Sequence, residues 1–238
     1  MNRILWPATL LAALLLPGVA NAGPFDDEFF SFSQNTWGAD PGAGPPASLV
    51  LADFDTLYPS GFVVGSTANN FMLFTAGDQL LNYLPSTGPA APLNATLVDP
   101  TTSISGIFGG QVAGLRLNID FNDAGLLAHP AGVAFGDLLL TGLTGSVAGL
   151  DGLSLRQFQG IANDFLGGAL EPYPIAEFSS LLMLVNGSFE GGFHNAWGDA
   201  HLALPQVAAV PEPATGALLA LGLAVLGSVQ RRRGRGPT

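Results

Sequence analysis

Oxygen-bearing side chains follow one another closely in the middle of the chain, and their spacing suggests calcium chemistry. Asn118, Asp120, Asn122 and Asp123 echo the opening of a calcium-binding loop. An EF-hand is excluded, because its sixth position needs glycine but is Asp123, and its twelfth needs glutamate but is His129. Calcium held between strand-edge oxygens is one hypothesis. The alternative is that these residues form the outward face of an amphipathic strand.

A second group of potential metal ligands lies near residue 200. Glu190, His194, Asp199 and His201 surround Trp197 in the sequence, and imidazole and carboxylate groups are sufficient ligands for zinc. No H-E-x-x-H spacing is present to support such a site. We therefore interpret these residues as surface and cap residues, with Trp197 packing against the domain.

Catalytic motifs are absent from the sequence. The nucleophile-elbow motif of serine hydrolases, G-x-S-x-G, does not occur. We predict that the protein is not an enzyme. Glycosidase chemistry needs only two placed carboxylates, which a linear sequence does not locate, so a secreted polysaccharide-acting hydrolase is one alternative. A calcium-dependent carbohydrate-binding or adhesin module is another, because five aromatic side chains could stack on sugars: Trp37, Tyr58, Tyr83, Tyr173 and Trp197.

Composition removes further classes of function. The chain has no lysine and no cysteine, which excludes phosphate-loop NTPases, Schiff-base enzymes and thiolate metal sites. Residues 23–205 hold 17 acids against Arg116 and Arg156, a formal charge of −15. Such a surface repels phosphate, so we predict no nucleic-acid partner. We also predict no cofactor apart from the calcium considered above.

The N-terminus has the three parts of a secretion signal. A short basic start ending at Arg3 precedes an apolar run over 4–16, and Pro17 and Gly18 interrupt that run. Ala20 and Ala22 then form an A-x-A cleavage site for signal peptidase. We predict a signal peptide over 1–22 and an extracytoplasmic domain over 23–205.

The C-terminus carries a second tripartite signal. Val210, Pro211, Glu212 and Pro213 end a linker over 206–213, and an apolar segment over 214–230 follows as a predicted transmembrane helix. The uncharged run 214–229 would span ~24 Å as a helix, slightly less than a ~30 Å hydrocarbon core. A basic tail over 231–238 is predicted to stay in the cytoplasm by the positive-inside rule, through four side chains: Arg231, Arg232, Arg233 and Arg235.

This ending resembles the PEP-CTERM sorting signal of Gram-negative bacteria. The resemblance implies an exosortase-like membrane processing enzyme as a partner and a precursor anchored in the inner membrane. It further implies a final place in the cell envelope or outside the cell, in association with exopolysaccharide or a biofilm matrix. Within the body, residues 32–38, 106–121 and 150–154 resemble an uncharacterised domain of bacterial surface proteins.

The hydrophobic pattern predicts an α+β fold, with a β-rich N-terminal part and two C-terminal helices packed on it. Predicted strands cover 29–33, 48–54, 61–65, 70–75, 95–98 and 111–121, and a short helix begins after Thr75. The last strand is the clearest, because apolar and polar residues alternate along it. Ser154 and Gln157 form a capping box for the first C-terminal helix, and the second is expected over 175–190.

Overall fold

The computed structural model describes residues 25, 29–130 and 132–205. The predicted signal peptide with Ala20 and Ala22, the linker and motif over 206–213, the apolar segment over 214–230 and the basic tail all lie outside the described residues. Among the described residues, no helix is both long enough and apolar enough to cross a membrane.

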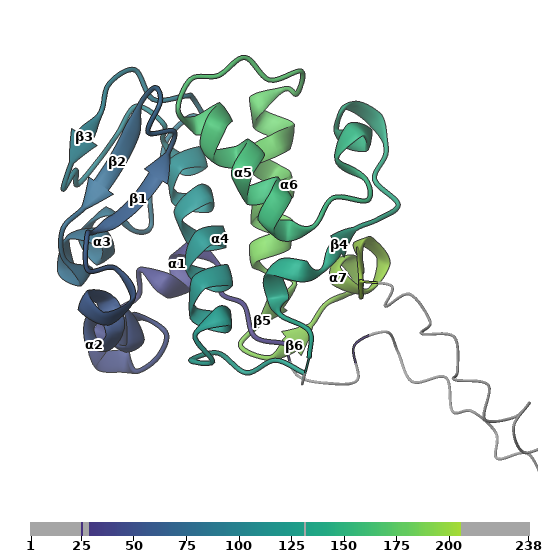
Figure 1. Ribbon diagram of the computed structural model, residues 1–238, viewed down its shortest axis with the longest axis horizontal. Coiled ribbons are helices and arrows are strands. Elements are labelled where there is room, and N and C mark those ends of the chain that lie inside the picture. Colours follow the sequence, from purple (N-terminus) through teal and green to yellow (C-terminus); the bar gives the residue numbers. More distant parts are fainter. Residues whose placement is uncertain (1–24, 26–28, 131, 206–238) are drawn as a thin grey trace, which may run out of the picture. The chain divides into compact units, whose positions relative to one another are not determined.

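A single buried helix organises the domain. Helix α4, Ile107–Asp123, buries 13 of its 17 residues. Two further helices, α5 (Leu155–Leu166) and α6 (Ile175–Asn186), pack against one side of α4. A three-stranded sheet lies on its other side, as Figure 1 shows. The sheet therefore packs on both α4 and α5, and α6 packs on α4.

The sheet is small and the other elements are short. Strands β1 (Phe62–Gly65) and β2 (Phe71–Phe74) are antiparallel, with Phe62 opposite Phe74, and β3 (Leu97–Val98) runs parallel to β2. The remaining elements are α1 (Gln34–Trp37), η1 (Pro41–Ala43), α2 (Ala47–Leu57), α3 (Gly77–Tyr83), η2 (Phe135–Asp137), β4 (Leu139–Leu140), η3 (Gly145–Leu150), β5 (Phe189–Glu190), β6 (Phe193–His194), α7 (Ala196–His201) and β7 (Leu202–Ala203).

The predicted mixture of helices and strands is confirmed, but two of the predicted strands are helices. Residues 111–121 lie within α4, and residues 48–54 lie within α2. The alternation along 111–121 was misleading because α4 is enclosed on almost all sides, so that positions two apart are both buried. The N-terminal part is consequently not β-rich. Strands at 61–65, 70–75 and 95–98 are confirmed, whereas 29–33 forms only one bridge, from Ser31 to Glu190.

The C-terminal helices follow the prediction more closely. The capping box is present in both directions, because Ser154 accepts from the backbone of Gln157 and the Gln157 side chain accepts from the backbone of Ser154. Helix α6 ends at Asn186, earlier than predicted. The chain leaves the helix at Gly187 because the next residues pair with the N-terminal segment, where Ser31 N–H donates to the carbonyl of Phe189 at 3.0 Å.

Buried amides tie α4 to both ends of the domain. The Asn118 side chain accepts from the backbone N–H of Phe32 at 2.8 Å and from the indole of Trp37 at 3.0 Å, and it donates to the carbonyl of Phe32 at 2.9 Å. It also donates to Asn186 at 3.1 Å, and Asn186 in turn donates to the Gln111 side chain at 2.9 Å. Asn118 and Asn186 are fully buried, so this network holds the N-terminal segment and α6 on one helix.

The network predicts a large effect of one amide. Replacing Asn118→Ala leaves three buried groups without a partner: the Phe32 backbone N–H, the Trp37 indole N–H and the side-chain oxygen of Asn186. It should lower the free energy of unfolding by about 3 kcal/mol or more. Urea denaturation of the variant measures this, with Asn94→Ala as the control. Asn94 is exposed, so its replacement should change stability by less than about 0.5 kcal/mol. Equal effects of the two variants would contradict the role given to the network.

Candidate functional site

A shallow groove of about 260 Å³ lies where η3, α6 and α7 meet, and it contains the half-buried Trp197. The indole contacts the imidazole of His201 in a tilted arrangement, with a centroid distance of 5.1 Å and an interplanar angle of 37°. His201 is itself fixed, because its Nδ1 lies 3.0 Å from the carbonyl of Thr141, to which it donates. One side of the groove is therefore formed by two aromatic side chains in contact, Trp197 and His201.

The rest of this Trp197 groove is apolar with a few polar groups on it. Its other lining residues are Leu143, Thr144, Val147, Glu177, Ser180, Leu181 and Leu184. The carboxylate of Glu177 accepts a hydrogen bond from Ser146, and the hydroxyl of Ser180 donates to the backbone of α6 at 2.8 Å. With one carboxylate and one stacked indole, the groove offers a binding surface for a flat apolar face, and it lacks a second carboxylate for acid and base catalysis.

The structure separates the potential zinc ligands found in the sequence. His194 Nδ1 and Asp199 form an exposed pair at 2.8 Å, whereas His201 lies in the Trp197 groove. The carboxylate of Glu190 accepts from the Ser33 backbone and from the Thr36 hydroxyl. Within residues 25, 29–130 and 132–205, no three histidine or acidic side chains gather as a metal site would require. Trp197 packs against the core, as the sequence interpretation expected.

The oxygen donors proposed for calcium lie on α4, and each has a different partner. Asn118 belongs to the buried amide network, and Asn122 accepts from the Phe135 backbone at 2.7 Å. Asp120 pairs with an arginine one turn earlier on the helix, and Asp123 pairs with an arginine of α5. The interpretation of these residues as the outward face of a strand is wrong. They lie on a helix, which directs positions 118 and 122 into the core. Calcium binding stays a prediction without a common site for these four residues.

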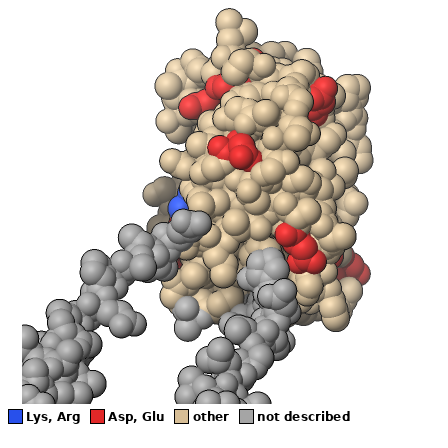
Figure 2. All heavy atoms as spheres, turned by 90° about the vertical axis from the view of Figure 1, so that its right-hand side faces the viewer, with Lys and Arg blue, Asp and Glu red and all other residues tan. Residues whose placement is uncertain are grey.

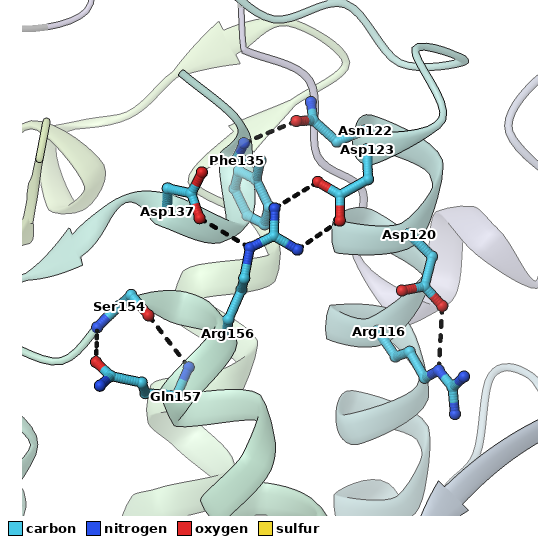
Figure 3. A network of polar contacts seen from close by, with 9 residues as sticks. All are labelled: Arg116, Asp120, Asn122, Asp123, Phe135, Asp137, Ser154, Arg156 and Gln157. Atoms are coloured by element: carbon cyan, nitrogen blue, oxygen red, sulfur yellow. Dashed lines mark hydrogen bonds and ion pairs between the residues drawn. The ribbon is translucent and has the colours of Figure 1, made fainter. Parts of the chain in front are cut away.

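Two arginines pair with three of the acids in the domain, and Figure 3 shows all three around α4, η2 and α5. Arg156 binds Asp123 through two nitrogens and Asp137 through Nε at 2.8 Å, and the hydrogen bond to Asp123 raises the pKa of its guanidinium. Arg116 pairs with Asp120 at 3.1 Å. Its guanidinium also lies 4.9 Å from the ring centroid of Phe62, a cation–π distance. Both arginines thus serve contacts within the domain.

The remaining acids are spread over the surface. On the face drawn in Figure 2, acidic side chains lie apart from one another among uncharged residues. A second groove, of about 280 Å³, does have two carboxylates in its lining, Asp40 and Asp78. The Asp40 carboxylate accepts a hydrogen bond from the Gly42 backbone at 2.8 Å and so caps η1. This carboxylate therefore has a structural role.

Most of the aromatic residues considered for sugar stacking are core residues. Trp37, Tyr58 and Tyr83 are buried, which leaves Tyr173 and Trp197 half-buried at the surface. Sequence reasoning singled out Trp197 but missed the groove beside it. One wall of the groove could have been predicted from α6. Glu177, Ser180 and Leu184 are three and four residues apart, so they share one face of that helix. No comparable pattern in the sequence indicated that η3 lines the groove as well.

Tyr58 has an unusual environment at the edge of a further groove, of about 460 Å³. Its hydroxyl is buried and has no hydrogen-bond partner among the described residues. Burial raises the pKa of this phenol, and the negative charge of Asp120 raises it further. Arg116 lies 5.8 Å from the ring centroid and opposes the shift. The phenol is therefore held in its neutral form.

Comparison with known families finds one match. A family model described as the PEP-CTERM protein-sorting motif matches residues 209–233. The match covers none of the described domain, so the resemblance noted for 32–38, 106–121 and 150–154 stays a prediction. Searches of curated proteins and of solved structures found nothing that matches the chain.

The raised pKa of Tyr58 predicts a loss of stability in alkali. Below pH 10 the phenol is protonated in both states, but above its ordinary pKa of 10.0 only the unfolded chain releases the proton. The free energy of unfolding should then fall by about 1.4 kcal/mol per pH unit from this group. Urea denaturation at pH 9 and pH 11 should show a smaller fall for Tyr58→Phe than for the parent protein. Tyr173→Phe is the control, and an equal fall in the parent and Tyr58→Phe would contradict the prediction.

Proposed function

We propose, given that residues 209–233 of this chain are a PEP-CTERM protein-sorting motif, that the chain is an exported protein delivered to the cell envelope or extracellular matrix. PEP-CTERM signals are processed by exosortase, a membrane enzyme, so the motif supports an exosortase-sorted extracellular protein with a membrane-anchored precursor. The finer assignment to a matrix or biofilm rests on the resemblance alone and is part of the proposal.

Two features of the body are compatible with an extracytoplasmic role. The chain lacks cysteine, so its folding does not depend on the redox state of the compartment. The Asn118 network and the phenylalanine-rich core stabilise the domain instead. A domain stabilised in this way suits a protein that must persist outside the cell. Export itself is proposed from the signal peptide predicted over 1–22.

The proposed role is structural and not enzymatic. None of the three histidines bonds a hydroxyl within the described part of the chain, since His129 contacts the Pro130 carbonyl, His194 pairs with Asp199 and His201 contacts the Thr141 carbonyl. A serine hydrolase needs such a bond between base and nucleophile. A polysaccharide-acting hydrolase would find two carboxylates in the groove lined by Asp40 and Asp78, and a carbohydrate-binding module would use the groove with Trp197. Exopolysaccharide is the proposed partner of the body in either setting.

The sorting motif predicts a specific failure of processing. From the sequence we expect Pro211 and Pro213 to disfavour a helix at the motif, because proline lacks an amide donor and restricts the residue before it. Replacing Pro211, Glu212 and Pro213 together by alanine should leave export intact and trap the protein with its tail uncleaved. Mass spectrometry of the protein from membranes and from the medium of an exosortase-containing host measures the C-terminus.

The control for that experiment changes the linker and leaves the motif intact. Gln206→Ala should be processed like the parent. Released protein whose C-terminus still contains Arg231 to Arg235, or release that the triple alanine variant leaves unchanged, would mean that the segment is only an anchor.

The anchored precursor predicts opposite locations for two reporters. A reporter fused after Pro205 should lie outside the inner membrane, and one fused after Thr238 should lie in the cytoplasm, because the arginine cluster favours the cytoplasmic side. Alkaline phosphatase and green fluorescent protein fusions report the two compartments. Replacing the four tail arginines by glutamine tests the cause. Both reporters on one side in the parent chain would overturn the transmembrane assignment.

A further inference from the structure

The Trp197 groove is held in place on both of its sides by hydrogen bonds. On one side, Asn195 caps α7 by accepting from the Gly198 backbone at 2.8 Å, and β7, which follows α7, pairs with β4. On the other side, the Ser146 hydroxyl joins η3 to Glu177 of α6. Walls that are fixed in this way lower the ordering cost of binding a ligand.

The polar groups of the groove are mostly hydrogen-bond acceptors. The Glu177 carboxylate only accepts, and the Ser180 hydroxyl donates its proton to a carbonyl within α6 at 2.8 Å, so its oxygen accepts as well. His201 donates through Nδ1 to a backbone carbonyl, which leaves its Nε2 as an acceptor. Trp197 and Thr144 contribute donors, an indole N–H and a hydroxyl. A ligand that matches this lining must both donate and accept hydrogen bonds.

These groups select a hydroxyl-bearing ligand over a charged one. An ammonium group only donates and a carboxylate only accepts, whereas a hydroxyl does both. None of the described residues that line the groove is a lysine or an arginine. The carboxylate of Glu177 and the excess of acids over residues 23–205 repel anions. The groove therefore suits a neutral molecule with several hydroxyl groups.

The apolar part of the groove and its size narrow the class of ligand further. Trp197 is half-buried and Leu184 is 37% exposed, so apolar surface is open to solvent beside the acceptors. A pyranose ring has both an apolar C–H face and hydroxyls around its edge, which an aromatic ring and nearby polar groups can recognise together. The volume of about 260 Å³ is below the ~300–1,000 Å³ typical of pockets that enclose a whole drug-sized ligand. The groove therefore fits one ring of a longer chain.

We propose that the Trp197 groove binds one neutral pyranose unit of a polysaccharide, with the sugar ring against the indole and its hydroxyls on Glu177 and His201. This ligand class rests on the proposed function, in which exopolysaccharide is the partner of the body. A single-ring contact is weak by itself, but many copies of the protein on one polymer hold it through multivalency. Polymers of uronic acids are disfavoured by the charge of the groove.

Isothermal titration calorimetry with oligosaccharides of equal length measures this binding. The full chain is kept in a detergent without a sugar headgroup, so that the detergent does not compete. The probes are neutral hexamers of glucose, mannose and galactose, and the acidic hexamer of galacturonic acid. We expect binding of at least one neutral hexamer, and binding of the acidic hexamer that is weaker by about tenfold or more.

Four variants of the full chain locate the site. Trp197→Ala should weaken binding of the neutral hexamer by about tenfold or more. Phe193→Ala is its control, because Phe193 is 82% exposed and lies outside the lining. Glu177→Gln keeps the shape of the side chain, removes its charge and should narrow the preference for neutral over acidic hexamers. Glu171→Gln removes a carboxylate outside the lining and should leave that preference unchanged.

Far-UV circular dichroism checks that each variant is folded, and Glu177→Gln, at an exposed position, tests the site even where Trp197→Ala does not fold. Neutral-hexamer binding that Trp197→Ala leaves unchanged would overturn the groove as the site and leave exopolysaccharide as a partner elsewhere on the domain. Tighter binding of the acidic hexamer by the parent chain would overturn the neutral ligand class. Failure of all the neutral hexamers to bind would overturn the sugar site itself, whereas export and sorting are decided separately by the processing and reporter experiments.

Discussion

The described domain depends on the enclosure of α4. Residues 109, 110 and 114 of this helix are glycine, and a side-chain carbon at Gly110 would collide with Gln34. The close approach allows amides of neighbouring segments to meet inside the core, where Asn118 and Asn186 satisfy each other and the extended backbone at Phe32. A buried amide without a partner is costly. The N-terminal segment and α6 therefore have one compatible position on α4.

The amide network also explains how segments that are distant in the sequence come to lie side by side in the fold. Ser31 lies far from α6 in sequence, yet its hydroxyl donates to the Asn186 carbonyl at 2.8 Å and accepts from the Phe189 amide at 3.1 Å. These bonds place the start of the domain beside the β5–β6 hairpin near its end.

Electrostatics has a smaller part in holding the domain together. The ion pairs of Arg116 and Arg156 are partly exposed, so each stabilises the fold only modestly. Both arginines make their ion pairs within the domain. On the face drawn in Figure 2 the acidic side chains are dispersed, and the chain has no lysine. Such a surface limits binding of anionic polymers.

Local signals in the sequence determined the features that depend on neighbouring residues. The capping box at Ser154, the hydrophobic face of α5, the strands at β1 and β2 and the terminal sorting motif could all be predicted, because a few adjacent residues specify each of them. Only the tertiary structure decided the conformation of 111–121. Leu115, Leu117, Ile119 and Phe121 alternate as in a strand, but an enclosed helix buries every such position. It also places Asn118 and Asn122 inside, where they bind backbone groups, and so separates the oxygens that looked like one calcium site. Whether a polar side chain faces water or another segment depends on what packs around it, and the sequence does not contain that information locally.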